Sequence, residues 1–242
     1  MIEVQHLAKR FGKVEALGDI TFQARDGRVT GLLGPNGAGK STTLRILYTA
    51  IRADSGSAAV DGHDCTREPL AVRRSLGVLP HATGLYPNLT ARENVRYYGE
   101  LQGLSGEFLE RSIETLVARL DLAGIADRRA HGLSQGQRIK VALARALVHG
   151  PRNVILDEPT NGLDVMAIRT LRDLIRGLRD EGRCVLLSSH VMQEIGALCD
   201  DLVIIGKGRV VLQGSPDEVR AATGCDDLEE AFVRLSQAEH AA

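Results

Sequence analysis

The stretch GPNGAGKS, Gly34 to Ser41, fits the pattern G-x-x-x-x-G-K-[ST] and decides the fold prediction. Its glycines let the backbone wrap closely around a ligand, and backbone N–H groups that lead into a helix N-terminus favour anions. Lys40 adds a mobile cation, and Ser41 adds a hydroxyl that suits a Mg²⁺ ion. The stretch therefore predicts a polyphosphate site.

The residues on either side predict a strand–loop–helix unit. Val29–Leu33 is a short apolar run typical of a buried strand. From Ser41 to Ile51, apolar side chains recur at helical spacing, so we expect a helix over 41–51. A glycine-rich turn that binds no ligand would not need a lysine and a serine, Lys40 and Ser41, between a buried strand and a helix.

Composition and charge exclude several classes of protein. No apolar run approaches the roughly 18 residues of a membrane span, and the N-terminus lacks the apolar region of a signal peptide, which predicts a cytoplasmic protein. A net charge of -1 gives no electrostatic footprint for nucleic acid, so no nucleic-acid partner is expected. The four cysteines show no C-x-x-C spacing, which predicts buried or idle thiols rather than disulfides or a zinc site.

The order of elements predicts an α/β fold with a mostly parallel sheet. Alternating polarity predicts antiparallel strands near 2–7 and 20–24, and shorter strands follow near 57–60 and 76–80, with a turn at Asp61-Gly62. Helical spacing over about 90–122 and 138–149 predicts a helical subdomain inserted at about 85–150. Further strands are expected at 154–156, 185–187 and 202–205, and their alternation with helices favours a parallel sheet covered on both faces.

The C-terminal part differs in charge from the rest of the chain. From Ser215 onward seven acidic residues stand against Arg220 and Arg234. Short helices are expected near 216–223 and 228–237. We therefore divide the chain into a domain over 1–220 and a short acidic helical appendage over 221–242, interpreted as a solvated surface.

A second motif is an apolar strand, Asn153–Leu156, that ends in the adjacent carboxylates Asp157 and Glu158. At the carboxyl end of a buried parallel strand, Asp157 can hold the hydration shell of a Mg²⁺ ion on Ser41. Glu158, one residue further, can polarise a water for in-line attack while Lys40 stabilises the charge that develops on the phosphoryl oxygens. If Asp157 and Glu158 were only surface acids at the end of a strand, there would be no reason to expect Lys40 and Ser41 elsewhere in the chain.

A third motif, Leu133-Ser134-Gln135-Gly136-Gln137, precedes a largely apolar helix. Ser134 and Gln137 match a capping box, in which both side chains satisfy backbone amides of the first helical turn. A helix N-terminus flanked by Gly136 is also an anion site, so the same residues can contact phosphate. Spacing along the chain leaves both interpretations open.

Taken together, GPNGAGKS, LSQGQ, NVILDEP, NGLD and SSH, in that order, resemble the ATP-binding subunit of an ABC transporter over residues 1–220. The resemblance implies a P-loop NTPase core, ATP and Mg²⁺ as ligands, and Glu158, Lys40 and His190 as catalytic residues. It further implies that Ser134–Gln137 meets the ATP held by a second copy, and that residues 161–164 join the two sites across this homodimer. The nucleotide-binding residues then implied are Phe11, Gly34, Pro35, Asn36, Gly37, Ala38, Gly39, Lys40, Ser41, Thr42, Ser134, Gly136 and Gln137; those for metal are Ser41, Asp157 and His81.

Two positions depart from the usual family pattern. His81 stands where the family places a glutamine that touches magnesium, although a neutral imidazole can accept a hydrogen bond from a metal-bound water. Gln135 replaces the commonest glycine of the signature. Phe11 falls at the family's adenine-stacking aromatic, and the alternative is a phenylalanine that plugs the small sheet.

The resemblance also implies a separate integral membrane permease, with this chain peripheral on the cytoplasmic face. Residues 81–94 resemble two-component exporters, which would place residues 85–98 against the permease. The alternative is a soluble ABC-type ATPase without a permease; a DNA-repair ATPase is disfavoured because only about ninety residues separate the phosphate loop from LSQGQ. A P-loop GTPase is disfavoured because the guanine-reading motif N-K-x-D is absent.

Overall fold

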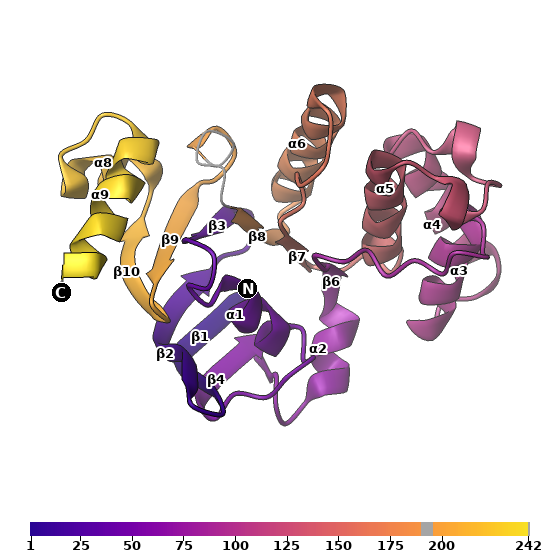
Figure 1. The fold of residues 1–242 in the computed structure, drawn as a ribbon. Helices are drawn as coiled ribbons and strands as arrows, with labels where there is room; N and C mark the ends of the chain where they lie inside the picture. The colour runs from indigo at the N-terminus through magenta and orange to yellow at the C-terminus, as the bar shows by residue number, and fades with distance from the viewer. Residues whose placement is uncertain (190–195, 242) are drawn as a thin grey trace.

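The computed structural model describes residues 1–189 and 196–241, where ten strands form one sheet in the order β5-β4-β1-β2-β10-β9-β3-β8-β7-β6 (Figure 1). The strands are β1 Ile2–Phe11, β2 Val14–Ala24, β3 Val29–Leu33, β4 Ser55–Val60, β5 His63–Asp64, β6 Leu76–Leu79, β7 Asn153–Asp157, β8 Cys184–Ser189, β9 Asp201–Gly206 and β10 Arg209–Gly214. The helices are α1 Lys40–Leu47, α2 Pro69–Ser75, α3 Ala91–Leu101, α4 Gly106–Arg119, α5 Gln135–Leu147, α6 Val165–Asp180, α8 Pro216–Thr223 and α9 Leu228–Ala241, with 3-10 turns η1 Ala123–Ile125 and η2 Ala130–Gly132.

The central strands β9-β3-β8-β7-β6 pair in parallel, as predicted. β3 and β7 are buried along their whole length, because helices cover both faces of the sheet. Leu156 and Leu187 enter one apolar core together with α6, whereas Ile155 and Leu186 enter a second core together with α1. The parallel strands therefore end along one edge, where α/β sheets bind ligands.

The first residues form the predicted antiparallel unit. β1 pairs antiparallel with both β2 and β4. A single parallel bridge, between Asp19 of β2 and Arg209 of β10, joins this unit to the central sheet. β10, the two-residue β5 and α2 were not predicted, because their sequences show no sustained apolar alternation or helical stripe.

Two predicted helix boundaries need correction. α1 ends at Leu47 rather than Ile51, because Thr49 takes a positive φ of 62°, a left-handed conformation that a helix cannot pass through. α5 begins at Gln135 rather than Arg138, because its capping box at Ser134 starts the helix earlier than the apolar spacing indicated.

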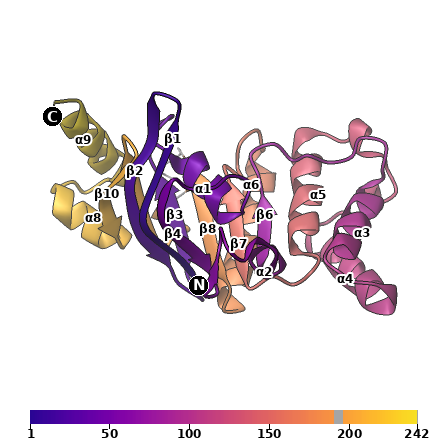
Figure 2. The ribbon, with the colours of Figure 1, turned by 90° about the horizontal axis from the view of Figure 1, so that it is seen from below.

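The helices α3, α4 and α5 pack on one another at one end of the molecule, whereas α8 and α9 lie at the other end, beside β10 (Figure 2). Asn94 of α3 is fully buried and accepts a hydrogen bond from the backbone N–H of Tyr86 over 2.8 Å. Its amide also donates to the carbonyls of Tyr86, Leu89 and Thr90. This one side chain ties residues 86–90 to α3.

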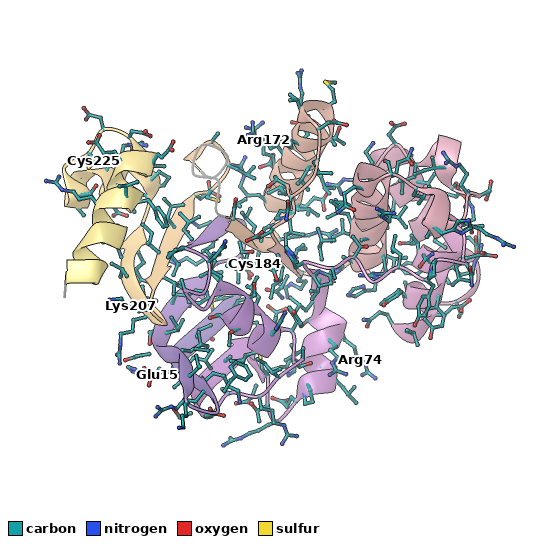
Figure 3. The ribbon with its side chains drawn as sticks, viewed as in Figure 1. Glu15, Arg74, Arg172, Cys184, Lys207 and Cys225 are labelled. Atoms are coloured by element: carbon teal, nitrogen blue, oxygen red, sulfur yellow. The ribbon has the colours of Figure 1, made fainter. Side chains whose placement is uncertain are left out.

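The four cysteines are buried free thiols, as predicted. Cys184 lies in the central sheet and Cys225 beside α8, well apart (Figure 3). Burial raises the pKa of Cys184 to about 12, so its reactive thiolate is scarce at neutral pH.

Candidate functional site

The phosphate loop lies between β3 and α1, and two of its glycines are required by geometry. A Cβ at Gly34 would lie 2.3 Å from the carbonyl oxygen of Ile205 on the neighbouring strand β9. Gly39 takes a φ of 112°, and a Cβ there would lie 2.9 Å from the carbonyl oxygen of Ala16. Only glycine fits these two positions, so the loop shape follows from the motif.

Lys40, the first residue of α1, is buried and points into this loop. Its Nζ donates to the carbonyl oxygens of Gly34 and Pro35 over 2.6 and 3.1 Å. Burial lowers the pKa of Lys40, an effect that the nearby carboxylates of Glu158 and Asp157 oppose. The structure thus brings the predicted cation close to the predicted acids.

Asp157 ends β7 as predicted, and only 3% of it is exposed. Its Oδ1 lies 3.5 Å from the Ser41 Oγ of α1 and accepts a hydrogen bond of 2.7 Å from Ser188 Oγ of β8. Ser188 stands directly opposite Asp157 in the parallel register of β7 and β8. These hydrogen bonds compensate for the burial of the Asp157 side chain.

Glu158 follows with a φ of 51°, which is rare for a residue with a side chain and typical of functional sites. Its backbone N–H is held by Ser188, which accepts through both Oγ (2.9 Å) and the carbonyl oxygen (3.2 Å). The Glu158 Oε2 lies 3.9 Å from His81 Nδ1, so His81 faces this carboxylate.

Ser188 was not predicted as a site residue. Its Oγ donates to the Asp157 carboxylate and accepts from the backbone N–H of Glu158, so it positions both acidic residues. The available signal was a polar residue at the carboxyl end of an apolar strand, the same signal that identified Asp157. Which strand lies next to β7 follows from tertiary pairing alone.

A cavity of about 90 Å³ joins these acids to the start of α5. Glu158, His81 and Gln135 are among the residues that line it. Gln135 also packs against the loop after β7, because a Cβ at Gly162 would lie 3.2 Å from its Cγ. The third motif and the 161–164 loop therefore form one continuous surface within a single chain.

The capping box at Ser134 is present, as one interpretation predicted. Ser134 Oγ accepts from the backbone N–H of Gln137 over 3.3 Å, and Gln137 Oε1 accepts from the backbone N–H of Ser134 over 3.0 Å. In both ribbon views α5 stands away from α1, which follows the phosphate loop (Figures 1 and 2). The structure does not bring Ser134–Gln137 onto the phosphate loop of its own chain.

Phe11 lies at the end of β1 and is 49% exposed, which excludes the alternative that it plugs the small sheet. One face of its ring lies 5.5 Å from Lys9 Nζ, which is held by Asp54 over 2.7 Å. An exposed aromatic ring beside a cation can stack on a nucleobase. His190 lies outside the described residues.

The residues present fit a Mg²⁺ ion bound together with phosphate. In the described part of the chain, no three His, Cys, Asp or Glu side chains converge to hold a metal ion by themselves. Magnesium is commonly bound by one or two protein oxygens together with substrate phosphates and waters. Ser41 Oγ and Asp157 Oδ1, 3.5 Å apart beside the phosphate loop, supply such a pair.

Within residues 1–189 and 196–241, no helix combines the length and apolarity needed to cross a bilayer.

Known proteins are similar to this chain in sequence and share its fold. The family model described as "ABC transporter" matches residues 17–161. The ABC transporter ATP-binding protein NatA of Bacillus subtilis (strain 168) is 38% identical, covering 96% of this chain and 97% of its own length. A Nod factor export ATP-binding protein I of Burkholderia lata is 35% identical over 94% of this chain and 75% of its own. A solved "ATP binding subunit of ABC transporter" superposes with a TM-score of 0.91 at 31% identity, covering 97% of this chain and 99% of that one.

Proposed function

Since this chain belongs to the ABC transporter family, as an ATP-binding subunit that hydrolyses ATP, we propose that it powers export of a substrate through a separate membrane permease. The observation that carries the proposed mechanism is the meeting of two motifs at one edge of the sheet. Ser41 of the phosphate loop lies 3.5 Å from Asp157, and Glu158 follows Asp157 directly. This places a phosphate cradle next to a candidate base.

Each residue in this arrangement then has a chemical role. Glu158 accepts the proton of a water that attacks the terminal phosphorus in line, while the bond to the bridging oxygen breaks and ADP leaves with that electron pair. Lys40 stabilises the charge on the phosphoryl oxygens. Ser41 and Asp157 would hold a Mg²⁺ ion, which would neutralise charge on the phosphate oxygens. Ser188 holds the Asp157 carboxylate and the backbone of Glu158 in place.

The orientation of α5 supports a head-to-tail homodimer with two ATP molecules between the subunits. Ser134, Gly136 and Gln137 do not reach the phosphate loop of their own chain, so they are available to the ATP held by a second copy. The N-terminus of α5 supplies the amides and dipole that suit a phosphate. His190 is assigned to the same phosphate by family resemblance.

Export is supported by the Nod factor export relative, whose match covers 94% of this chain. The subunit is placed on the cytoplasmic face, peripheral to its permease. Co-purification of a tagged chain with a membrane protein tests this proposal. A chain recovered from native membranes with no membrane protein would favour the alternative, a soluble ABC-type ATPase.

The hydrolytic role is tested with Glu158→Gln, which preserves shape but removes the base. We expect retained ATP binding, loss of phosphate release by at least about 100-fold, and accumulation of an ATP-bound dimer in size-exclusion chromatography. Glu107→Gln is the matched control, because the Glu107 side chain lies on α4 and is 83% exposed. Unchanged hydrolysis by Glu158→Gln would remove that carboxylate from the mechanism.

A further inference from the structure

A groove of about 400 Å³ opens between α4, the end of α5 and the end of α6. It lies at the edge of the sheet where β7 and β8 begin, because Gly150 and Arg183, which both line it, closely precede these two strands. The phosphate loop and the paired acids lie at the opposite edge, where the parallel strands end. The groove is also distinct from another of about 270 Å³, which Arg73 of α2 and Arg145 of α5 line. It is therefore separate from the catalytic site.

One face of α4 forms a wall of this groove. The residues of that face recur three or four positions apart, as neighbours on a helix surface do: Phe108, Arg111, Ser112, Thr115, Leu116 and Arg119. Leu147 and Leu178, from α5 and α6, line the groove as well and are buried, whereas the Phe108 side chain is 61% exposed. The groove thus combines buried apolar side chains with an exposed aromatic ring.

Three arginines line the groove, and no acidic residue of the described chain does. Arg119 and Arg183 share one carboxylate, that of Glu181, at N···O distances of 2.7 and 2.9 Å. Their side chains are only 31% and 24% exposed, so water screens their charge incompletely. Arg111 faces Glu107 at 3.5 Å, but both side chains are mostly exposed, and such pairs contribute little. Positive charge therefore exceeds negative charge along the groove.

Arg119 and Arg183 keep N–H groups for a ligand. Arg119 contacts Glu181 through Nη1, whereas Arg183 contacts it through Nε and donates from Nη1 to the carbonyl oxygen of Pro151 over 2.9 Å. A guanidinium has five N–H donors, so both side chains have donors beyond those that these contacts use. A phosphate group can accept from two guanidinium groups at once, and arginine is well suited to this geometry.

We propose that this groove binds a small molecule that carries a phosphate group and an aromatic ring. The phosphate accepts hydrogen bonds from Arg119 and Arg183, and the ring packs against Phe108. Clefts of roughly 300–1,000 Å³ with apolar walls and a few convergent polar groups are typical of small-molecule sites. The ligand contacts both α4 and the residue before β8, so it joins the helical subdomain to the central sheet. The inference does not depend on the proposed export.

The experiment uses a local reporter. The chain contains no tryptophan, so Phe108→Trp places a single fluorescent indole in the groove. Phenyl phosphate is the probe, titrated at constant ionic strength beside inorganic phosphate, which lacks the ring, and benzyl alcohol, which lacks the phosphate. We expect phenyl phosphate to change the fluorescence at concentrations at least about tenfold lower than either of the others. No response, or an equal response to inorganic phosphate, would overturn the inference.

Arg183→Gln, added to the reporter chain, should raise the midpoint of the phenyl phosphate titration about tenfold, because it removes one charged partner of the phosphate. Arg169→Gln is the matched control, since Arg169 is an exposed arginine of α6 that does not line the groove. Thermal unfolding checks the fold of Arg183→Gln, because Arg183 also holds Pro151. If that variant unfolds, Arg111→Gln decides, since the Arg111 side chain is 68% exposed; its midpoint should rise at least about threefold.

Two further measurements separate this groove from the phosphate loop and from an effect of the reporter. The fluorescence response should persist when Lys40→Ala is added, because Lys40 lies at the opposite edge of the sheet. Isothermal titration calorimetry with the chain that keeps Phe108 should give a similar affinity for phenyl phosphate. Loss of the response with Lys40→Ala, equal midpoints for Arg183→Gln and Arg169→Gln, or no binding by calorimetry would overturn the inference.

Discussion

Replacing Ser188 with alanine removes the hydroxyl that connects the Asp157 carboxylate to the backbone N–H of Glu158. The Oγ donates to Asp157 over 2.7 Å and accepts from the Glu158 N–H over 2.9 Å. The Glu158 N–H keeps the Ser188 carbonyl at 3.2 Å, so the main loss is the charge-assisted bond to Asp157, worth about 1.5–3 kcal/mol. We expect the free energy of unfolding to fall by that amount. If the same bond orients the acids during hydrolysis, the rate should fall about 10- to 100-fold.

Urea unfolding and phosphate release measure the two effects. The matched control is Thr30→Val on the neighbouring strand β3, because Thr30 is fully buried and its Oγ1 has no hydrogen-bond partner among the described residues. Removing that hydroxyl should leave hydrolysis unchanged and raise stability by up to about 1 kcal/mol. A Ser188→Ala protein with the wild-type unfolding midpoint and the wild-type rate would refute the bridging role.

Three further changes test other parts of the structure. Gly39→Ala should abolish ATP binding in a nucleotide-binding assay. Gly39 has a φ of 112°, and a Cβ there would lie 2.9 Å from the carbonyl oxygen of Ala16. Binding of wild-type strength would contradict this loop geometry. Asn94→Ala should lower the free energy of unfolding in urea by about 2–4 kcal/mol, since it removes the hydrogen bonds that join a fully buried side chain to part-buried backbone groups of residues 86–90; a loss below 1 kcal/mol on the same scale would contradict it. Burial lowers the pKa of His149 below its usual value of 6.5. At a pH below 6.5 the histidine therefore binds a proton more readily in the unfolded chain than in the folded chain. The free energy of unfolding should then fall as the pH falls. His149→Gln should reduce the difference in unfolding midpoint between pH 7.5 and 5.5, and an unchanged difference would exclude this histidine as its source.

Local sequence chemistry predicted much of the site. The glycines and Lys40 define a phosphate loop in any chain that places a buried strand before them and a helix after them. The apolar strand that ends in Asp157 and Glu158 was predicted in the same way, because a core rejects paired carboxylates. These features depend on neighbours within a few residues, which the sequence displays directly.

Other features depended on residues far apart in the chain. The pairing of β7 with β8 places Ser188 opposite Asp157, and periodicity within either strand does not specify which strand lies beside it. Arg73 of α2 and Arg145 of α5 are far apart in the sequence, and only the fold brings them to one groove. The sequence by itself determined a nucleotide-binding α/β chain with paired acids. Only the tertiary structure decided which hydroxyl lies beside those acids and which two arginines line one groove, because both follow from long-range packing.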